Sequence, residues 1–128
     1  MKYYIGIDLG GTNIVAGVVD ENFSLIATAS NKTNAGRPAD QIAETMAQTA
    51  AQAAEKAGIS MEQIESVGIG SPGIVDSQKR EVIFASNLDF YNAPIGQLLE
   101  DRLHRPVFLA NDADAAAYGE FMAGAGKT

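Results

Sequence analysis

A short polar turn near the N-terminus carries residue types that could bind a phosphate group. Between two runs of alternating apolar residues, the sequence places Asp8, Gly10, Gly11, Thr12 and Asn13. Glycines leave the backbone bare, so its N–H groups could approach an anion closely, and Thr12 and Asn13 add hydroxyl and amide donors. Asp8 offers a carboxylate where a phosphate-bound Mg²⁺ would sit. An ordinary Gly-Gly hairpin with an aspartate at its edge would have the same letters, and spacing alone favours neither interpretation.

A second candidate site is the pair Asn111-Asp112, which follows a short apolar run. Open α/β sheets place their ligands where a strand ends and a helix begins. Either residue could simply be the helix N-cap, because both types are favoured there. Alternatively, Asp112 accepts the proton of a substrate hydroxyl. A helix N-terminus would make Asp112 a weak base, which phosphoryl transfer tolerates because orienting the nucleophile matters more than strong deprotonation.

Other motifs are weaker. Asn87 and Asn92 of SNLDFYN are expected in a polar loop, where they could bind sugar hydroxyls but are more simply turn residues. GIGSPG, residues 68–73, has the spacing of a dinucleotide fingerprint, yet no periodic helix follows it. The final GAGKT lacks the glycine that a P-loop requires, because Phe121 occupies that position. His104, the single histidine, is expected near a helix end in a structural role.

The elements that must position these residues alternate between strands and helices. Period-two patterns predict strands over residues 2–8, 14–19 and 23–30, joined by short turns into an antiparallel meander. Apolar residues recurring every three or four positions predict a helix between Pro38 and Gly58. A strand in IESVGIGSPGIV, a further strand in REVIFAS, a helix in PIGQLLEDRLH, a strand in PVFLAN and a helix in DADAAAYGEFMAGAG complete the order. This order predicts an α/β fold with a mixed sheet and helices on its faces.

Composition narrows the class of protein. The 128 residues suit one domain, carry a net charge of -7 and include no cysteine. The basic residues are scattered, so no nucleic-acid partner is expected. No apolar run is long enough for a membrane span, and the start of the chain does not have the pattern of a signal peptide. We expect a cytoplasmic protein that contacts no membrane.

Four motifs, in this order and at these spacings, resemble the N-terminal domain of the ROK family: IGIDLGGTNIVAGVVD, VGIGSPGIVD, NLDFYNAPIGQLLEDRL and PVFLANDADAAAYGE. That family comprises bacterial sugar kinases, among which the glucokinases are the most similar, and related sugar-responsive repressors. The resemblance covers essentially the whole chain. It implies an actin/hexokinase-type (ribonuclease H-like) half-domain with a βββαβαβ core, which agrees with the predicted order of elements.

The resemblance also implies roles at matching positions. The turn from Asp8 to Asn13 would wrap the phosphates of ATP, with Asp8 near Mg²⁺ through phosphate or water. Gly73 would form part of a sugar-pocket wall, and Asn87, Asn111 and Asp112 would bind sugar hydroxyls. Asp112 would also be the catalytic base, aligning the sugar 6-hydroxyl against the γ-phosphate. Many members carry lysine at position 13, a difference that we do not expect to change these roles.

Family kinases are about twice as long as this chain or longer, beyond the usual size of one domain. Their second half supplies another phosphate loop, the adenosine pocket, a Glu-x-Gly-His motif and a Cys-rich zinc site, none of which this sequence contains. We therefore expect residues 1–128 to be the N-terminal lobe of a longer, homo-oligomeric kinase whose C-terminal lobe, with any structural zinc, is absent from this chain. The lobe alone should be inactive.

The resemblance leaves the substrate open. The leading hypothesis is ATP-dependent phosphorylation of glucose to glucose 6-phosphate, a step of glycolysis and carbohydrate metabolism. The alternatives are a kinase for fructose, mannose or an N-acylhexosamine, and the sugar-binding domain of a ROK-type repressor. Such repressors carry an N-terminal helix-turn-helix, whereas this sequence enters a predicted strand directly after Met1.

Overall fold

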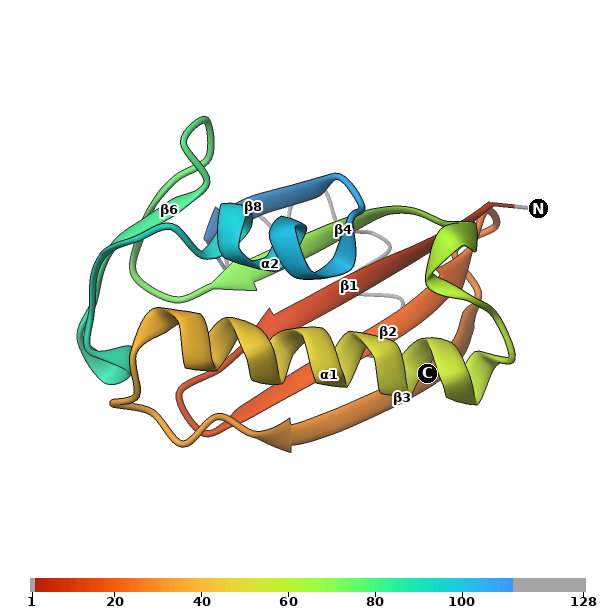
Figure 1. Ribbon diagram of the computed structural model, residues 1–128, viewed down its shortest axis with the longest axis horizontal. Helices are drawn as coiled ribbons and strands as arrows, with labels where there is room; N and C mark the ends of the chain where they lie inside the picture. The colour runs from red at the N-terminus through yellow and green to blue at the C-terminus, as the bar shows by residue number, and fades with distance from the viewer. Residues whose placement is uncertain (1, 112–128) are drawn as a thin grey trace.

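The computed structural model describes residues 2–111, which form a larger and a smaller sheet with two α-helices (Figure 1). The elements of the first half are β1 (Tyr3–Leu9), β2 (Asn13–Asp20), β3 (Leu25–Lys32), α1 (Ala39–Ala57) and the 3₁₀ helix η1 (Met61–Gln63). Those of the second half are β4 (Ile64–Ser71), β5 (Ile74–Asp76), β6 (Glu81–Ala85), the 3₁₀ helix η2 (Ser86–Leu88), β7 (Phe90–Ala93), α2 (Ile95–Leu103) and β8 (Val107–Asn111).

The larger sheet is mixed, as predicted, and has the strand order β3-β2-β1-β4-β8. β1, β2 and β3 pair antiparallel and confirm the predicted meander, although β3 ends two residues later than expected. β4 pairs parallel with β1, and β8 pairs parallel with β4. The carboxyl ends of β1, β4 and β8 therefore meet at one edge of the sheet, which Figure 1 shows on the side where β6 lies.

Both α-helices cover the same face of this sheet (Figure 1). α1 packs on β2 and β3, and α2 packs beside α1 and on β8. Alternation turns Ile5, Ile7 and Leu9 of β1 toward the helices, where all three are fully buried. The face of α1 predicted from its spacing is the buried one, and Gly58 ends the helix in the left-handed conformation with φ 75°.

The smaller sheet, of order β5-β6-β7, was not predicted as a separate unit. The strand expected in REVIFAS exists as β6, but it belongs to this sheet rather than to the larger one. The prediction that SNLDFYN forms a polar loop is wrong, because the segment forms η2 and β7 and buries Leu88 and Phe90. Burial of each of these two side chains stabilises the packing of η2 and β7 on the core by about 1.5–3 kcal/mol.

No helix within residues 2–111 is long and apolar enough to cross a membrane. The helix expected after Asn111, and with it Asp112 and the terminal GAGKT, lies outside the described residues.

Candidate active site

The carboxyl edge of the parallel strands carries two predicted site residues, Asp8 and Asn111. Asp8 of β1 lies in register with Gly70 of β4, and Gly70 in turn with Ala110 of β8. Because neighbouring strands are about 4.8 Å apart, Asp8 and Ala110 lie about 10 Å apart across this edge. Asn111 follows Ala110 and is paired with the fully buried Ser71 at the end of β4. Alternation therefore places Asp8 and Asn111 at the same edge but on opposite faces of the sheet.

Asp8 lies on the sheet face that α1 and α2 leave uncovered, because its neighbours Ile7 and Leu9 point into the core. Its side chain is exposed, yet partial burial raises the pKa of its carboxyl above the ordinary value of 3.8. Desolvation is the cause, since burial disfavours the charged form. A bound cation would offset this cost, so the position suits a carboxylate that meets Mg²⁺ through phosphate or water.

The turn after β1 is not a mirror-image Gly-Gly hairpin, because neither Gly10 nor Gly11 has a positive φ. The glycines are required instead by close approach. A Cβ on Gly10 would lie 2.9 Å from the carbonyl oxygen of Asn13, to which the Gly10 N–H donates at 3.0 Å. A Cβ on Gly11 would lie 3.0 Å from Nδ2 of Asn87. The hairpin alternative thus has the wrong backbone geometry, and the bare backbone is used for contact.

Two backbone amides of this turn have no acceptor within residues 2–111. Across residues 2–111, the N–H groups of Gly11 and Thr12 donate to no protein acceptor. The amide of Gly10 does not belong to this set, because it closes the turn onto Asn13. Successive backbone N–H groups of this kind form a concave donor site for anions, and phosphate is a common occupant. The turn therefore retains the donors that a phosphate loop needs.

Asn87, which is predicted to bind sugar, lies next to the turn of residues 8–13, called here the phosphate turn. It lies in η2, is exposed, and its side chain occupies the space beside Gly11 that a Cβ would need. The buried Leu88 anchors η2 beneath it. Asn92, by contrast, lies in β7 with a left-handed φ of 49°, and no described contact joins it to the turn. Of the two amides in SNLDFYN, only Asn87 belongs to this site.

Gly73 has a structural requirement of its own. Its φ is 88°, and a Cβ there would lie 2.1 Å from the carbonyl oxygen of Phe84. The residue allows the chain to leave β4 and enter β5 against β6. Because a strand and not a helix follows Gly73, residues 68–73 do not form a dinucleotide fingerprint, as expected.

Thr33 belongs to the same region, although no sequence pattern predicts its role. It follows β3, is fully buried, and its hydroxyl donates to the carbonyl of Gly10 at 2.7 Å. A single threonine after a strand has no distinctive spacing, so only the fold could reveal this contact. Among the described residues, no three His, Cys, Asp or Glu side chains are grouped so that they could hold a metal ion.

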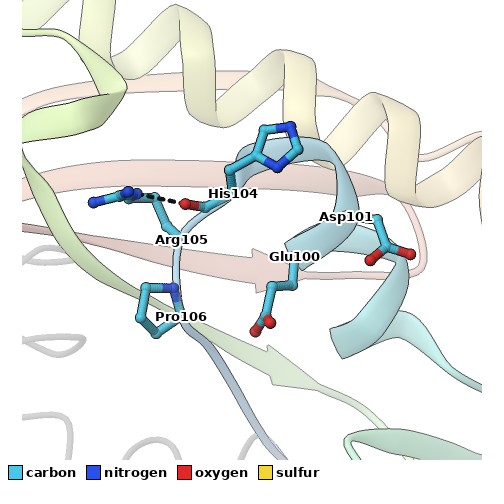
Figure 2. A pocket seen from close by; sticks show the side chains of 5 residues that line it. All are labelled: Glu100, Asp101, His104, Arg105 and Pro106. Atoms are coloured by element: carbon cyan, nitrogen blue, oxygen red, sulfur yellow. Dashed lines mark hydrogen bonds between the residues drawn. The ribbon is translucent and has the colours of Figure 1, made fainter.

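A shallow depression of about 460 Å³ lies at the other edge of the sheet, and Figure 2 shows its lining around the end of α2. It is lined by Glu100, Asp101, His104, Arg105 and Pro106. These residues precede β8, so the depression is on the side opposite Asp8. His104 ends α2, as predicted, with a left-handed φ of 56°. The depression takes no part in the site described above.

Comparison with known proteins identifies the family. The sequence profile of the ROK family matches residues 4–128. This chain belongs to the ROK family. It is 42% identical over 127 residues to a glucokinase of Streptomyces coelicolor, covering 99% of this chain and 38% of that protein.

Solved structures agree with the ROK assignment. The chain superposes with a TM-score of 0.81 and 40% identity on a ROK glucokinase of Streptomyces griseus in complex with glucose and AMPPNP, covering 97% of this chain and 38% of that one. The family also includes repressors, since a xylose repressor of Caldicellulosiruptor bescii is 28% identical, over 91% of this chain and 29% of its own length. The chain thus spans well under half the length of these relatives.

Proposed function

We propose that this chain is the N-terminal lobe of an ATP-dependent hexose kinase, with glucose as the first candidate substrate. The contact between Gly11 and Asn87 carries this proposal, because it joins a turn with free amides to an amide suited to a sugar hydroxyl. The similarity to glucokinases, one of them solved with glucose and AMPPNP, supports the choice of substrates.

In this proposal the amides of Gly11 and Thr12, with the Thr12 hydroxyl and the Asn13 amide, bind phosphate oxygens of ATP. Asp8 fits a place beside Mg²⁺, since it is an exposed carboxylate next to these donors. Mg²⁺ would neutralise negative charge that builds up on the phosphates during transfer.

Sugar binding would use Asn87 and Asn111, with the backbone at Gly73 as part of the pocket wall. Asp112 would orient the sugar 6-hydroxyl and take up its proton. The sugar oxygen then forms a bond to the γ-phosphorus as the bond to the β-phosphate oxygen breaks, and ADP leaves with that electron pair. Catalysis of this kind depends on positioning, which rigid strand ends supply.

The reaction would need a second lobe, because this chain spans 38% of the Streptomyces coelicolor glucokinase. We propose that the complete protein is cytoplasmic, since its phosphate donor would be cytoplasmic ATP. We also propose that it is a homo-oligomer and that any structural zinc lies outside these 128 residues. The 128-residue chain alone should not phosphorylate sugars at a useful rate.

The test is a coupled assay of ADP release by the complete protein, with Mg²⁺ and a panel of glucose, fructose, mannose and N-acylhexosamines. We expect glucose to give the highest kcat/KM. A preference for another hexose would change the substrate and keep the reaction, whereas no ADP release with any sugar would contradict the proposal. Robust hexose phosphorylation by the 128-residue chain would show that the second lobe is not needed.

The second candidate function is a sugar-responsive repressor, because repressors such as that of Caldicellulosiruptor bescii share this region. A repressor would bind a sugar without turning it over. Titration calorimetry with sugar, together with the assay above and a DNA-binding measurement on the complete protein, separates the two functions.

A further inference from the structure

Thr33 holds the phosphate turn from its buried side. Its hydroxyl donates to the carbonyl of Gly10 at 2.7 Å, and its N–H donates to the carbonyl of Thr12 at 2.9 Å. One residue thus fixes the carbonyls on both sides of Gly11. Thr33 itself is fully buried, so water does not compete for these bonds.

The bond to Gly10 determines where a ligand-binding amide points. In a trans peptide the C=O of one residue and the N–H of the next point in opposite directions. All described peptide bonds are trans, so holding the Gly10 carbonyl against Thr33 directs the Gly11 N–H away from Thr33. In a tight β-turn this carbonyl would instead accept from the N–H three residues later. Thr33 therefore favours the conformation in which the Gly11 amide is free.

Arg37 connects Thr33 to the first long helix. Its Nη2 donates to the carbonyl of Thr33 at 2.6 Å and to Oγ1 of Thr45 in α1 at 3.1 Å. Its Nε donates to the carbonyl of Asn34 at 3.2 Å. The turn is thus joined through Thr33 and Arg37 to α1, which packs over β2 and β3.

We propose that Thr33 is a positioning residue of the nucleotide site, which presets the Gly11 amide for the phosphates of ATP. This rests on the proposed kinase function. Thr33 touches no substrate and acts through the turn. Its loss would make the turn sample other conformations, and ATP would have to select the competent one at a cost in apparent affinity.

The test compares variants in the complete protein. Thr33→Val keeps the shape and removes the hydroxyl, whereas Thr33→Ser keeps the hydroxyl. Thr49→Val is the matched control, because Thr49 is also fully buried and its hydroxyl makes two bonds that do not reach the turn. It donates to the carbonyl of Thr45 in α1 and accepts from Nδ2 of Asn31 in β3, both at 2.7 Å. We expect Thr33→Val to raise the KM for ATP about five- to tenfold, the size expected for one lost hydrogen bond. Thr33→Ser and Thr49→Val should leave it within about twofold, and the KM for sugar should not change.

Hydrogen exchange of the backbone amides supplies a second measurement that needs no activity. The amides to follow are the hydrogen-bonded ones of the turn, that of Gly10, which donates to Asn13, and that of residue 33, which donates to Thr12. Thr33→Val should speed exchange at both, and Thr33→Ser and Thr49→Val should not. Unchanged exchange and KM in Thr33→Val would overturn the proposal, as would equal changes in Thr49→Val. If the wild-type protein shows no kinase activity, the proposed function fails, and the exchange measurement still decides the role of Thr33.

If Thr33→Val does not fold, Arg37→Met replaces it, because this change leaves the Thr33 side chain in place and removes the bonds of Arg37 to Thr33, Asn34 and Thr45. It should raise the KM for ATP about two- to threefold and speed exchange at the hydrogen-bonded amides of Gly10 and Thr33 in the same way. An unchanged KM with unchanged exchange would again overturn the proposal.

Discussion

Asn87 lies against the backbone of Gly11, so closely that a Cβ on Gly11 would be 3.0 Å from its Nδ2 and 3.6 Å from its Cβ. The contact joins two segments that are distant in the sequence and come from different sheets. It is the point at which the candidate phosphate turn meets the candidate sugar residue. A substitution at Gly11 should therefore displace the Asn87 side chain, and the effects of substitutions at the two positions should be coupled.

Gly11→Ala should displace the Asn87 amide and lower kcat/KM for the sugar about tenfold, an effect typical of one misplaced hydrogen-bonding group. The backbone itself should tolerate alanine, because the φ of Gly11 is not positive. Steady-state kinetics of the complete protein would measure this change.

A double-mutant cycle supplies the control for Gly11→Ala. Asn87→Ala removes the amide that an added Cβ would meet, so Gly11→Ala should add little to the loss in that background. Fully additive losses would mean that Gly11 acts through something other than its contact with Asn87.

Gly73 and Gly36 form a matched pair for a prediction about stability. Both have a positive φ, 88° at Gly73 and 97° at Gly36, but only Gly73 has neighbours that a Cβ would strike. Gly73→Ala should therefore cost about 3–5 kcal/mol of unfolding free energy, from backbone strain and overpacking together. Gly36→Ala should cost about 1 kcal/mol, from strain alone. Urea denaturation curves would measure both, and equal losses would contradict the contact with Phe84 as the cause.

Periodic features of the fold were predictable from the sequence because they depend on local patterns. The helix that Gly58 ends and the meander of β1, β2 and β3 are examples. β5 was missed, because three residues are too few to establish an alternation. The composition of SNLDFYN predicts a loop because most of its residues are polar, yet Leu88 and Phe90 are buried in the structure.

The geometry of the candidate site was less predictable than its location. The pair Gly10-Gly11 could have supplied the positive φ angles of a hairpin turn, but neither residue has one. Glycine is required at both positions because a Cβ would approach a neighbouring group too closely. The contacts of Gly11 with Asn87, and of Gly10 with Thr33, depend on tertiary packing between distant segments. No local pattern carries that information, which is why Thr33 was not among the predicted residues.

The Asp8 carboxyl should make stability depend on pH in an unusual direction for an acid. Desolvation raises its pKa above 3.8, so the folded protein binds this proton more tightly than the unfolded chain does. The ionised form therefore costs stability above the raised pKa, and the cost disappears as the pH falls below the ordinary value. Asp8→Asn should raise the midpoint of thermal unfolding at pH 7, with a difference that shrinks toward pH 4.

Asp40→Asn is the control for this pH dependence, because Asp40 is exposed in the first turn of α1, far along the chain from the phosphate turn. Its difference from wild type should not follow the pattern of Asp8→Asn. If Asp8→Asn were less stable than wild type at pH 7, or its advantage were independent of pH, desolvation of the Asp8 carboxylate would not be the cause. Asp8→Asn should also lose kinase activity, since the proposed mechanism places the Asp8 carboxylate beside Mg²⁺.

Asp112→Asn in the complete protein tests the proposed base. Removing a positioned general base typically lowers kcat about 10²–10⁴-fold. Asparagine keeps the size and hydrogen-bonding capacity of the side chain, so glucose binding, measured by titration calorimetry, should change much less than kcat. Turnover above a few per cent of wild type would exclude Asp112 as the base, because positioning by the strand edge that Asn111 ends would then be sufficient. A loss of kcat with retained sugar affinity would assign proton transfer to Asp112 and leave sugar binding to Asn87 and Asn111.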